Sequence, residues 1–195
     1  MRARRRAKCI SRGFTLVEMM VVVVIISTVS VFAIPQAMIA VRGYRLHASA
    51  SAVASQLSVT RYRATSQFTP YRLNILISTR SFQMQRMTTA YAVPTGGDPQ
   101  ESQTMVLSTG VSYVATNPSA PQRPGTKIND AGDTALYFNT RGIPVDAGGS
   151  PVTNGGYAVY LQNEDSLYDA VTVSIGGRIT VWSWQPGSPG AWVRR

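Results

Sequence analysis

The sequence predicts an α+β protein in which a long N-terminal α-helix is followed by a β-rich globular domain. From Phe14 to Val41 the only charged residue is Glu18, so the N-terminal segment is apolar enough for a membrane-spanning helix. From residue 70 onward, short stretches of alternating apolar and polar residues are separated by glycine and proline. That pattern is typical of β-strands and turns.

The apolar segment has the length of one membrane span. As a helix, Phe14–Ile34 rises about 31 Å, close to the ~30 Å thickness of the hydrocarbon core of a bilayer. The sequence contains no second apolar run of this length, and six of the nineteen basic residues lie in the first twelve positions. The positive-inside rule therefore places the N-terminus in the cytoplasm and the rest of the chain across the membrane.

Glu18 interrupts this segment and disfavours an ordinary secretory signal peptide, whose apolar core is normally free of acids. A carboxylate near the hydrocarbon costs roughly 2.5 to 3.5 kcal/mol on insertion scales. We therefore expect Glu18 to have a function, with a tolerated acid at the membrane interface as the alternative.

The run Gly13-Phe14-Thr15-Leu16-Val17-Glu18, followed by the apolar segment and Pro35, resembles the N-terminus of type IV prepilins and type II secretion pseudopilins. The resemblance implies that a prepilin peptidase removes a basic leader, residues 1–13, by cleaving between Gly13 and Phe14. It also implies that Phe14 is N-methylated and that residues 14–38 are both the membrane span and the core of a filament of pilins or pseudopilins. The implied location is the inner membrane, with a periplasmic head that assembles into a pilus or pseudopilus.

The resemblance also implies a role for Glu18 in filament assembly. Cleavage gives Phe14 a new ammonium group, which the Glu18 carboxylate of a neighbouring subunit can neutralise, so that each charge offsets the desolvation of the other. A buried pair of this kind fixes the register between helices. Removing the six positive charges of the leader lowers the net charge from +10 to +4, which favours a structural subunit over a polyanion binder.

Beyond Pro35, the periodicity predicts that the helix continues as an amphipathic segment over residues 39–69. Its apolar positions are Leu46, Ala50, Val53, Leu57, Ala64 and Phe68. Pro35 and Gly43 predict a bend or local loosening of the helix, and Thr69-Pro70 predicts its end. The single histidine, His47, is expected to be a surface or packing residue.

Residues 70–195 are expected to form the β-rich head. Alternating apolar residues predict strands at 73–77, 82–84, 136–138 and 157–161. A Pro- and Gly-rich loop is expected at about 94–133, with at most two short strands at 105–107 and 111–114.

The clearest hairpin in the sequence joins Val171–Ile175 to Arg178–Trp182 through Gly176-Gly177. Two glycines supply the positive φ angles of a two-residue turn. Val171, Val173 and Ile175 are then expected to face the core.

Three segments of the chain resemble the GspH/FimT family of minor pseudopilins and minor pilins. Leu57–Ala64 is similar to the family's Leu-x-x-Ala-Arg-x-x-Ala, with Thr60 in place of Ala. Phe138–Pro144 is similar to its Phe-x-x-x-Gly segment, and Val171–Val181 is similar to its final hairpin with a Gly-Arg turn. The resemblance implies a pilin-like fold and the role of an H-type minor pseudopilin of type II secretion. A FimT-like minor pilin of a type IV pilus is the alternative.

A competing interpretation is that Gly142 and Gly176 are ordinary turn glycines, as found in any β domain.

An enzyme is disfavoured by composition. One cysteine, Cys9, and one histidine cannot supply a thiolate metal site, a redox pair or a histidine cluster, and the sequence has no GxSxG, P-loop or HExxH motif. The carboxylate groupings are Asp130 with Asp133, and Glu164 and Asp165 with Asp169. Loop acids at these spacings are usually solvated and occasionally form a weak calcium site. We expect no catalysis, no cofactor and no metal site.

DNA binding is a further alternative, because some FimT-like minor pilins bind DNA through a C-terminal Gly-Arg-x-Arg turn in natural transformation. Here Gly177-Arg178-Ile179-Thr180 lacks the second arginine. The candidate DNA contacts are Arg178, Arg194 and Arg195, which would pair with phosphates. The expected state of the last residues is a solvated C-terminus that follows a proline- and glycine-containing linker.

Overall fold

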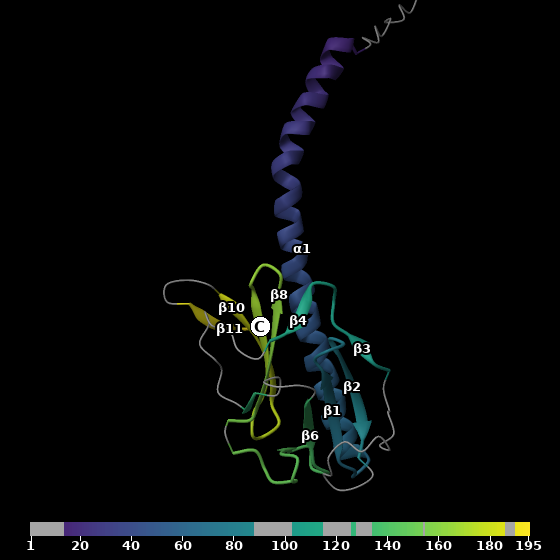
Figure 1. Ribbon diagram of the computed structural model, residues 1–195, viewed down its shortest axis with the longest axis vertical. Coiled ribbons are helices and arrows are strands. Elements are labelled where there is room, and N and C mark those ends of the chain that lie inside the picture. Colours follow the sequence, from purple (N-terminus) through teal and green to yellow (C-terminus); the bar gives the residue numbers. More distant parts are fainter. Residues whose placement is uncertain (1–13, 88–102, 115–125, 128–133, 154, 186–189) are drawn as a thin grey trace, which may run out of the picture. The chain divides into compact units, whose positions relative to one another are not determined.

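The computed structural model describes residues 14–87, 103–114, 126–127, 134–153, 155–185 and 190–195. It divides into two compact units, Met1–Ala40 and Val41–Arg195. The division falls within the long helix α1, Leu16–Ser66. The predicted fold class is confirmed, since β-strands of largely antiparallel sheets follow this helix (Figure 1).

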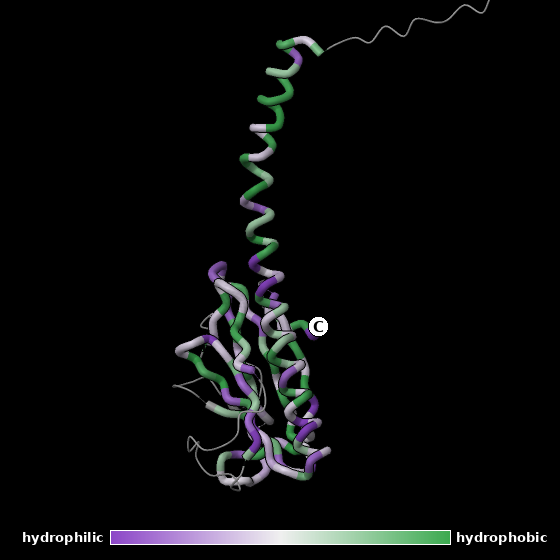
Figure 2. The backbone as a smooth tube through the Cα atoms, turned by 90° about the vertical axis from the view of Figure 1, so that its right-hand side faces the viewer, coloured by the Kyte–Doolittle hydropathy of each residue, from purple (hydrophilic) through white to green (hydrophobic). Residues whose placement is uncertain are grey.

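In the first unit, α1 carries apolar, solvent-exposed side chains along its whole length. Figure 2 shows this part of the helix mostly in the colours of hydrophobic residues. The helix is unbroken through Pro35 and also through Gly43 of the second unit, so the loosening predicted at these positions does not interrupt it.

The second unit contains the remainder of α1 and two sheets. The first sheet has the order β3-β2-β1-β6-β7, and all neighbouring strands are antiparallel. Its strands are β1 Tyr71–Leu76, β2 Ser81–Arg86, β3 Met105–Val106, β6 Thr134–Phe138 and β7 Pro144–Val145. The second sheet has the antiparallel order β11-β10-β9-β8-β4, and β5 pairs with β8 in parallel. Its strands are β4 Val111–Tyr113, β5 Thr126–Lys127, β8 Tyr157–Asn163, β9 Tyr168–Val173, β10 Ile179–Gln185 and β11 Ala191–Arg194.

The helix and both sheets share one hydrophobic core. Five of the six predicted apolar positions of α1 are buried in it, namely Leu46, Ala50, Val53, Leu57 and Ala64. The alternating residues that predicted strands point into the same core, among them Leu73, Ile75, Phe82, Met84, Leu136, Phe138, Val159 and Leu161. The amphipathic pattern of the sequence therefore identifies the core-facing side of each element.

Phe68 is the exception, with 80% of its surface exposed. The prediction placed it on the buried face of a helix reaching residue 69, whereas α1 ends at Ser66. Phe68 then has a positive φ of 49° in the turn that follows. The helical periodicity ends with the helix, so the prediction for Phe68 is wrong.

The predicted hairpin forms, but with a different turn. Val173 pairs with Ile179, and Ser174 accepts a hydrogen bond from the Gly177 N–H at 2.7 Å through its carbonyl. Of the two glycines only Gly177 has positive φ, as in a three-residue hairpin loop that closes on a residue in the left-handed region. Val171 and Val173 face the core as predicted. Ile175, predicted to face the core, is instead at the tip of the loop and 48% exposed.

The two short strands expected at 105–107 and 111–114 are present as β3 and β4. Most of the Pro- and Gly-rich segment expected at about 94–133 lies outside the described residues.

Candidate functional site

The N-terminal end of α1 begins with a capped first turn. The Thr15 hydroxyl oxygen accepts a hydrogen bond from the Glu18 N–H at 3.2 Å, so Thr15 caps the helix and Glu18 lies in its first turn. A carboxylate at this position is favoured by the helix dipole. The predicted assembly residue therefore also fits the local requirements of a helix start, as the spacing Thr-x-x-Glu indicates. Phe14 is described and exposed, while Gly13 lies outside the described residues.

The polar side chains within the apolar segment satisfy their hydrogen bonds locally. The hydroxyls of Ser27, Thr28 and Ser30 donate to backbone carbonyls three or four residues earlier, at 2.7 to 2.9 Å. Such bonds leave no hydroxyl donor unpaired in an apolar environment. Among the described residues, α1 is the one helix long and apolar enough to cross a membrane.

At the other end of α1, the guanidinium of Arg61 binds three backbone carbonyls from two distant turns. Its Nε donates to Gly142 O at 3.1 Å, its Nη1 donates to Gly177 O at 2.8 Å, and its Nη2 donates to Gly176 O at 3.3 Å. We call this arrangement the Arg61 hub. The three segments that resemble the GspH/FimT family therefore meet at one side chain.

Two of these glycines are required by their surroundings. Gly142 has a φ of 70°, and a Cβ there would lie 2.8 Å from Thr65 Cγ2 and 3.1 Å from Arg61 Cγ. Gly177 has a φ of 80°, and a Cβ would lie 2.8 Å from Gly142 O. Gly176, in contrast, has open space around it. The interpretation of Gly142 and Gly176 as ordinary turn glycines thus fits Gly176 and does not fit Gly142.

The candidate DNA residue Arg178 lies beside the hub, on an open groove of about 660 Å³. The groove is lined by Ser58, Arg61, Tyr62, Thr65, Gly176, Arg178 and Ile179. Among these described lining residues there is no carboxylate, and Tyr62 is 70% exposed. The groove therefore combines positive charge with an accessible aromatic ring.

The other two candidate DNA residues belong to an ordered strand. Arg194 is the last residue of β11 and pairs with Trp182, and Arg195 Nε donates to the Ser183 hydroxyl at 3.3 Å. Arg194 and Arg195 are exposed, as expected of a solvated C-terminus, but residues 191–194 form a strand that the sequence analysis did not predict. Arg194 pairs with Trp182, which lies four residues after Arg178 in the sequence. Four residues of a strand span about 13 Å, so Arg178 lies apart from Arg194 along the strand direction. The three arginines therefore do not form one compact cluster.

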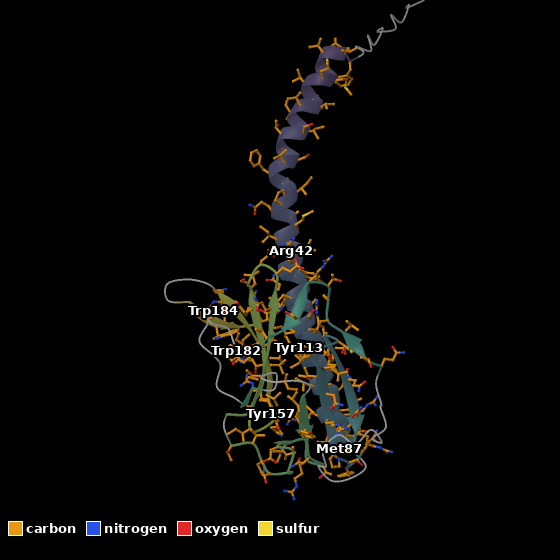
Figure 3. The ribbon with its side chains drawn as sticks, in the orientation of Figure 1. Arg42, Met87, Tyr113, Tyr157, Trp182 and Trp184 are labelled. Atoms are coloured by element: carbon orange, nitrogen blue, oxygen red, sulfur yellow. The ribbon has the colours of Figure 1, made fainter. Side chains whose placement is uncertain are left out.

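Aromatic packing holds this strand in place. The centroid of the Trp192 ring lies 5.5 Å from the Trp184 ring centroid and 6.1 Å from the Tyr160 ring centroid, and both ring pairs are tilted. The indole N–H of Trp182 donates to the Thr172 hydroxyl at 2.9 Å. Figure 3 shows Trp182 and Trp184 on β10. These contacts explain why the last residues form a strand, because they supply apolar burial that the sequence pattern does not reveal.

The carboxylates near residues 164–169 are bound to α1. Arg42 Nη1 lies 2.9 Å from Asp165 Oδ1, and His47 Nδ1 lies 3.1 Å from Asp169 Oδ2. Asp169 is buried on β9, and this burial raises the pKa of its carboxyl, an effect opposed by hydrogen bonds from Ser183 and His47. The expectation that these acids are solvated loop residues is therefore wrong for Asp169.

The arrangement of Asp169, His47 and Ser183 is not that of a catalytic triad. Ser183 hydrogen-bonds to the carboxylate rather than to the imidazole, so the histidine is not placed to take its proton. Among the described residues, no three metal-ligating side chains lie close enough together to hold a metal ion. The sequence could have predicted the burial of Asp169. Alternate residues of a strand point to the same face, and Asp169 lies two residues before Val171 and four before Val173, which face the core.

Residues 10–34 match the family model of the prokaryotic N-terminal methylation motif. No curated protein sequence is significantly similar to this chain. Among solved structures, the minor pseudopilin EpsH from the type 2 secretion system of Vibrio cholerae is similar at 14% identity, over 71% of this chain and 97% of that chain, with a TM-score of 0.47. That likeness is too distant to bear on function. The match at residues 10–34 confirms the prediction that the N-terminus of this chain carries a prepilin-type methylation motif.

Proposed function

We propose that this protein is an H-type minor pseudopilin, a structural subunit of the periplasmic pseudopilus of a type II secretion system. The observation that carries the proposal is the methylation motif at residues 10–34, which leads directly into a capped, apolar helix. The Arg61 hub supports the family resemblance, since all three resembling segments converge on it. The subunit is anchored in the inner membrane by one span, with its N-terminus in the cytoplasm and its head in the periplasm.

In this function, the prepilin peptidase cleaves between Gly13 and Phe14, and the new N-terminus of Phe14 is methylated. The Glu18 carboxylate lies in the first turn of α1, close in sequence to the new ammonium group. Within an apolar bundle, each charge alone carries a desolvation penalty. The pairing of one subunit's Glu18 with the neighbour's Phe14 ammonium offsets the desolvation penalty of both charges. The pair thereby sets the axial position of each subunit.

Processing is tested with Gly13→Ala, expressed as the full chain together with its peptidase. We expect an unprocessed band on a gel. Gly43→Ala is the matched control, because Gly43 lies within α1 and the nearest atom to an added Cβ is Leu167 Cδ1 at 3.8 Å, an ordinary contact. Normal processing of Gly13→Ala would refute the peptidase assignment.

Assembly is tested separately with Glu18→Ala. This variant is expected to be cleaved normally and to be missing from purified filaments, because the Phe14 ammonium of its neighbour then has no partner. Glu101→Ala removes an acid far from the N-terminus in the sequence and is expected to assemble like the parent protein. Equal incorporation of both variants would contradict the pairing.

A second candidate function is a FimT-like minor pilin of a type IV pilus that binds DNA in transformation. It is favoured by the groove beside the hub, where Arg61, Arg178 and Tyr62 offer positive charge and a ring for base stacking. The missing second arginine of the Gly-Arg-x-Arg turn and the separation of Arg178 from Arg194 and Arg195 weigh against it.

The two functions differ in what a deletion strain loses. A pseudopilin is required for secretion of folded proteins, whereas the alternative is required for DNA uptake. For DNA binding itself, a low-salt mobility shift with the purified chain that shows no complex removes the alternative. A tight complex abolished by Arg178→Ala but not by Arg80→Ala, another exposed arginine, would favour it over secretion.

A further inference from the structure

Charged and aromatic side chains of α1 directly follow the apolar segment, and one of them contacts two acids of the β8–β9 turn. We call Arg42, Tyr44 and Arg45 of α1, together with Glu164 and Asp165 of the β8–β9 turn, the headgroup collar. All five lie in the unit Val41–Arg195. Arg42 joins the two segments, since its Nη1 lies 2.9 Å from Asp165 Oδ1 and its Nε lies 3.9 Å from Glu164 Oε2. Figure 3 labels Arg42 on the helix.

Three collar side chains remain accessible. Tyr44 is 75% exposed, Arg45 is exposed, and the Glu164 side chain is 63% exposed. Within the described part of the chain, Tyr44 and Arg45 have no side-chain hydrogen bond or ion pair. The collar thus presents one aromatic ring, one free cation and one acid, and its two arginines balance its two carboxylates.

The position of the collar in the sequence gives its depth in a bilayer. From Phe14 to Val41 a helix rises about 42 Å, and a bilayer with its headgroup regions is about 40–45 Å thick. With Phe14 at the cytoplasmic interface, the collar residues of α1 fall in the outer headgroup layer. Tyrosine is enriched at this level, and a guanidinium binds phosphate with paired hydrogen bonds.

We propose that the collar docks on the headgroups of zwitterionic phospholipids. Arg45 binds the lipid phosphate, Glu164 faces the lipid ammonium, and the ring of Tyr44 lies among the headgroups. Because the charges of the collar cancel, docking does not require anionic lipid. This inference depends on the membrane anchoring proposed above, and it gives the unassembled subunit a fixed depth in the membrane.

The test uses the full chain carrying Cys9→Ser and Ala48→Cys, with a spin label at residue 48, an exposed position one turn beyond Tyr44. The chain is reconstituted into vesicles of phosphatidylethanolamine and phosphatidylcholine. The ratio of lipid-shielded to water-exposed label is measured with a water-soluble nickel chelate. In Tyr44→Ala/Arg45→Ala this ratio is expected to fall about fivefold, the equivalent of about 1 kcal/mol, which is the upper end for one exposed ion pair.

The matched control is Tyr62→Ala/Arg141→Ala, which removes an exposed tyrosine and an exposed arginine far from the collar and is expected to leave the ratio unchanged. An unchanged ratio in the collar variant, or an equal fall in the control, overturns the proposal. Shielding seen only after phosphatidylglycerol is added overturns the assignment to zwitterionic lipid. Release of the chain from vesicles by alkaline carbonate instead refutes the membrane anchoring, so the two failures are distinguishable.

Discussion

Replacing Arg61 with methionine removes the guanidinium of the hub while keeping an unbranched side chain of similar length. The bonds to Gly142 O at 3.1 Å and Gly177 O at 2.8 Å are short, and each is worth about 1.5 kcal/mol for a charged donor. The third, at 3.3 Å and exposed, adds little. We therefore expect Arg61→Met to lower the free energy of unfolding by about 3 kcal/mol.

The assay is urea unfolding of the full chain in detergent micelles, followed by tryptophan fluorescence. Arg61→Lys is expected to lower the free energy of unfolding by about half as much, because an ammonium reaches one carbonyl but cannot span two turns. Arg178→Met, which removes an exposed arginine from the same groove, is expected to change stability by less than about 0.5 kcal/mol. A loss below about 1 kcal/mol for Arg61→Met, or a loss equal to that of Arg178→Met, would refute the hub as a stabilising contact.

Three further predictions follow from the same unit. In urea unfolding, Gly177→Ala is expected to cost about 2 kcal/mol or more, because of its positive φ and a 2.8 Å contact, while Gly176→Ala is expected to be nearly neutral; equal costs would contradict this. Because burial raises the folded-state pKa of Asp169 above its ordinary value of 3.8, its ionisation destabilises the fold. The stability of the parent is therefore expected to fall relative to Asp169→Asn as pH rises above about 4, and a pH-independent difference would refute this. Trp192→Ala is expected to cost about 2 kcal/mol and to speed amide exchange in residues 191–195, whereas unchanged exchange would show that other contacts hold β11.

Much of the fold follows from local pattern. The amphipathic spacing of α1 predicts its buried face, and period-two alternation predicts the core-facing residues of β1, β2, β6 and β8. These predictions succeed because each depends on the geometry of one element alone. They fail where an element ends, as at Phe68, or where turn geometry rather than composition decides the outcome, as at Gly176 and Ile175.

The candidate site likewise has a part that the sequence predicts and parts that it does not predict. The N-terminal motif is contiguous, so it is recognised from sequence alone, and the roles of Gly13, Phe14 and Glu18 within it stay predictions. The hub joins Arg61 to turns about 80 and 115 residues away, and no local rule predicts that three weak motifs share one side chain. The strand at the C-terminus was also missed, because its stability comes from tryptophan packing between separate strands rather than from its own four residues.

The convergence of two turns on Arg61 also bears on how the second unit unfolds. A helix end normally frays independently of the rest of a protein, and a hairpin loop opens on its own. Here, opening of either turn breaks bonds to the same guanidinium, so the last turns of α1, the 139–143 turn and the tip of the β9–β10 hairpin form one cooperative unit. Amide hydrogens in these three places are therefore expected to exchange with a common opening free energy, although they lie far apart along the chain.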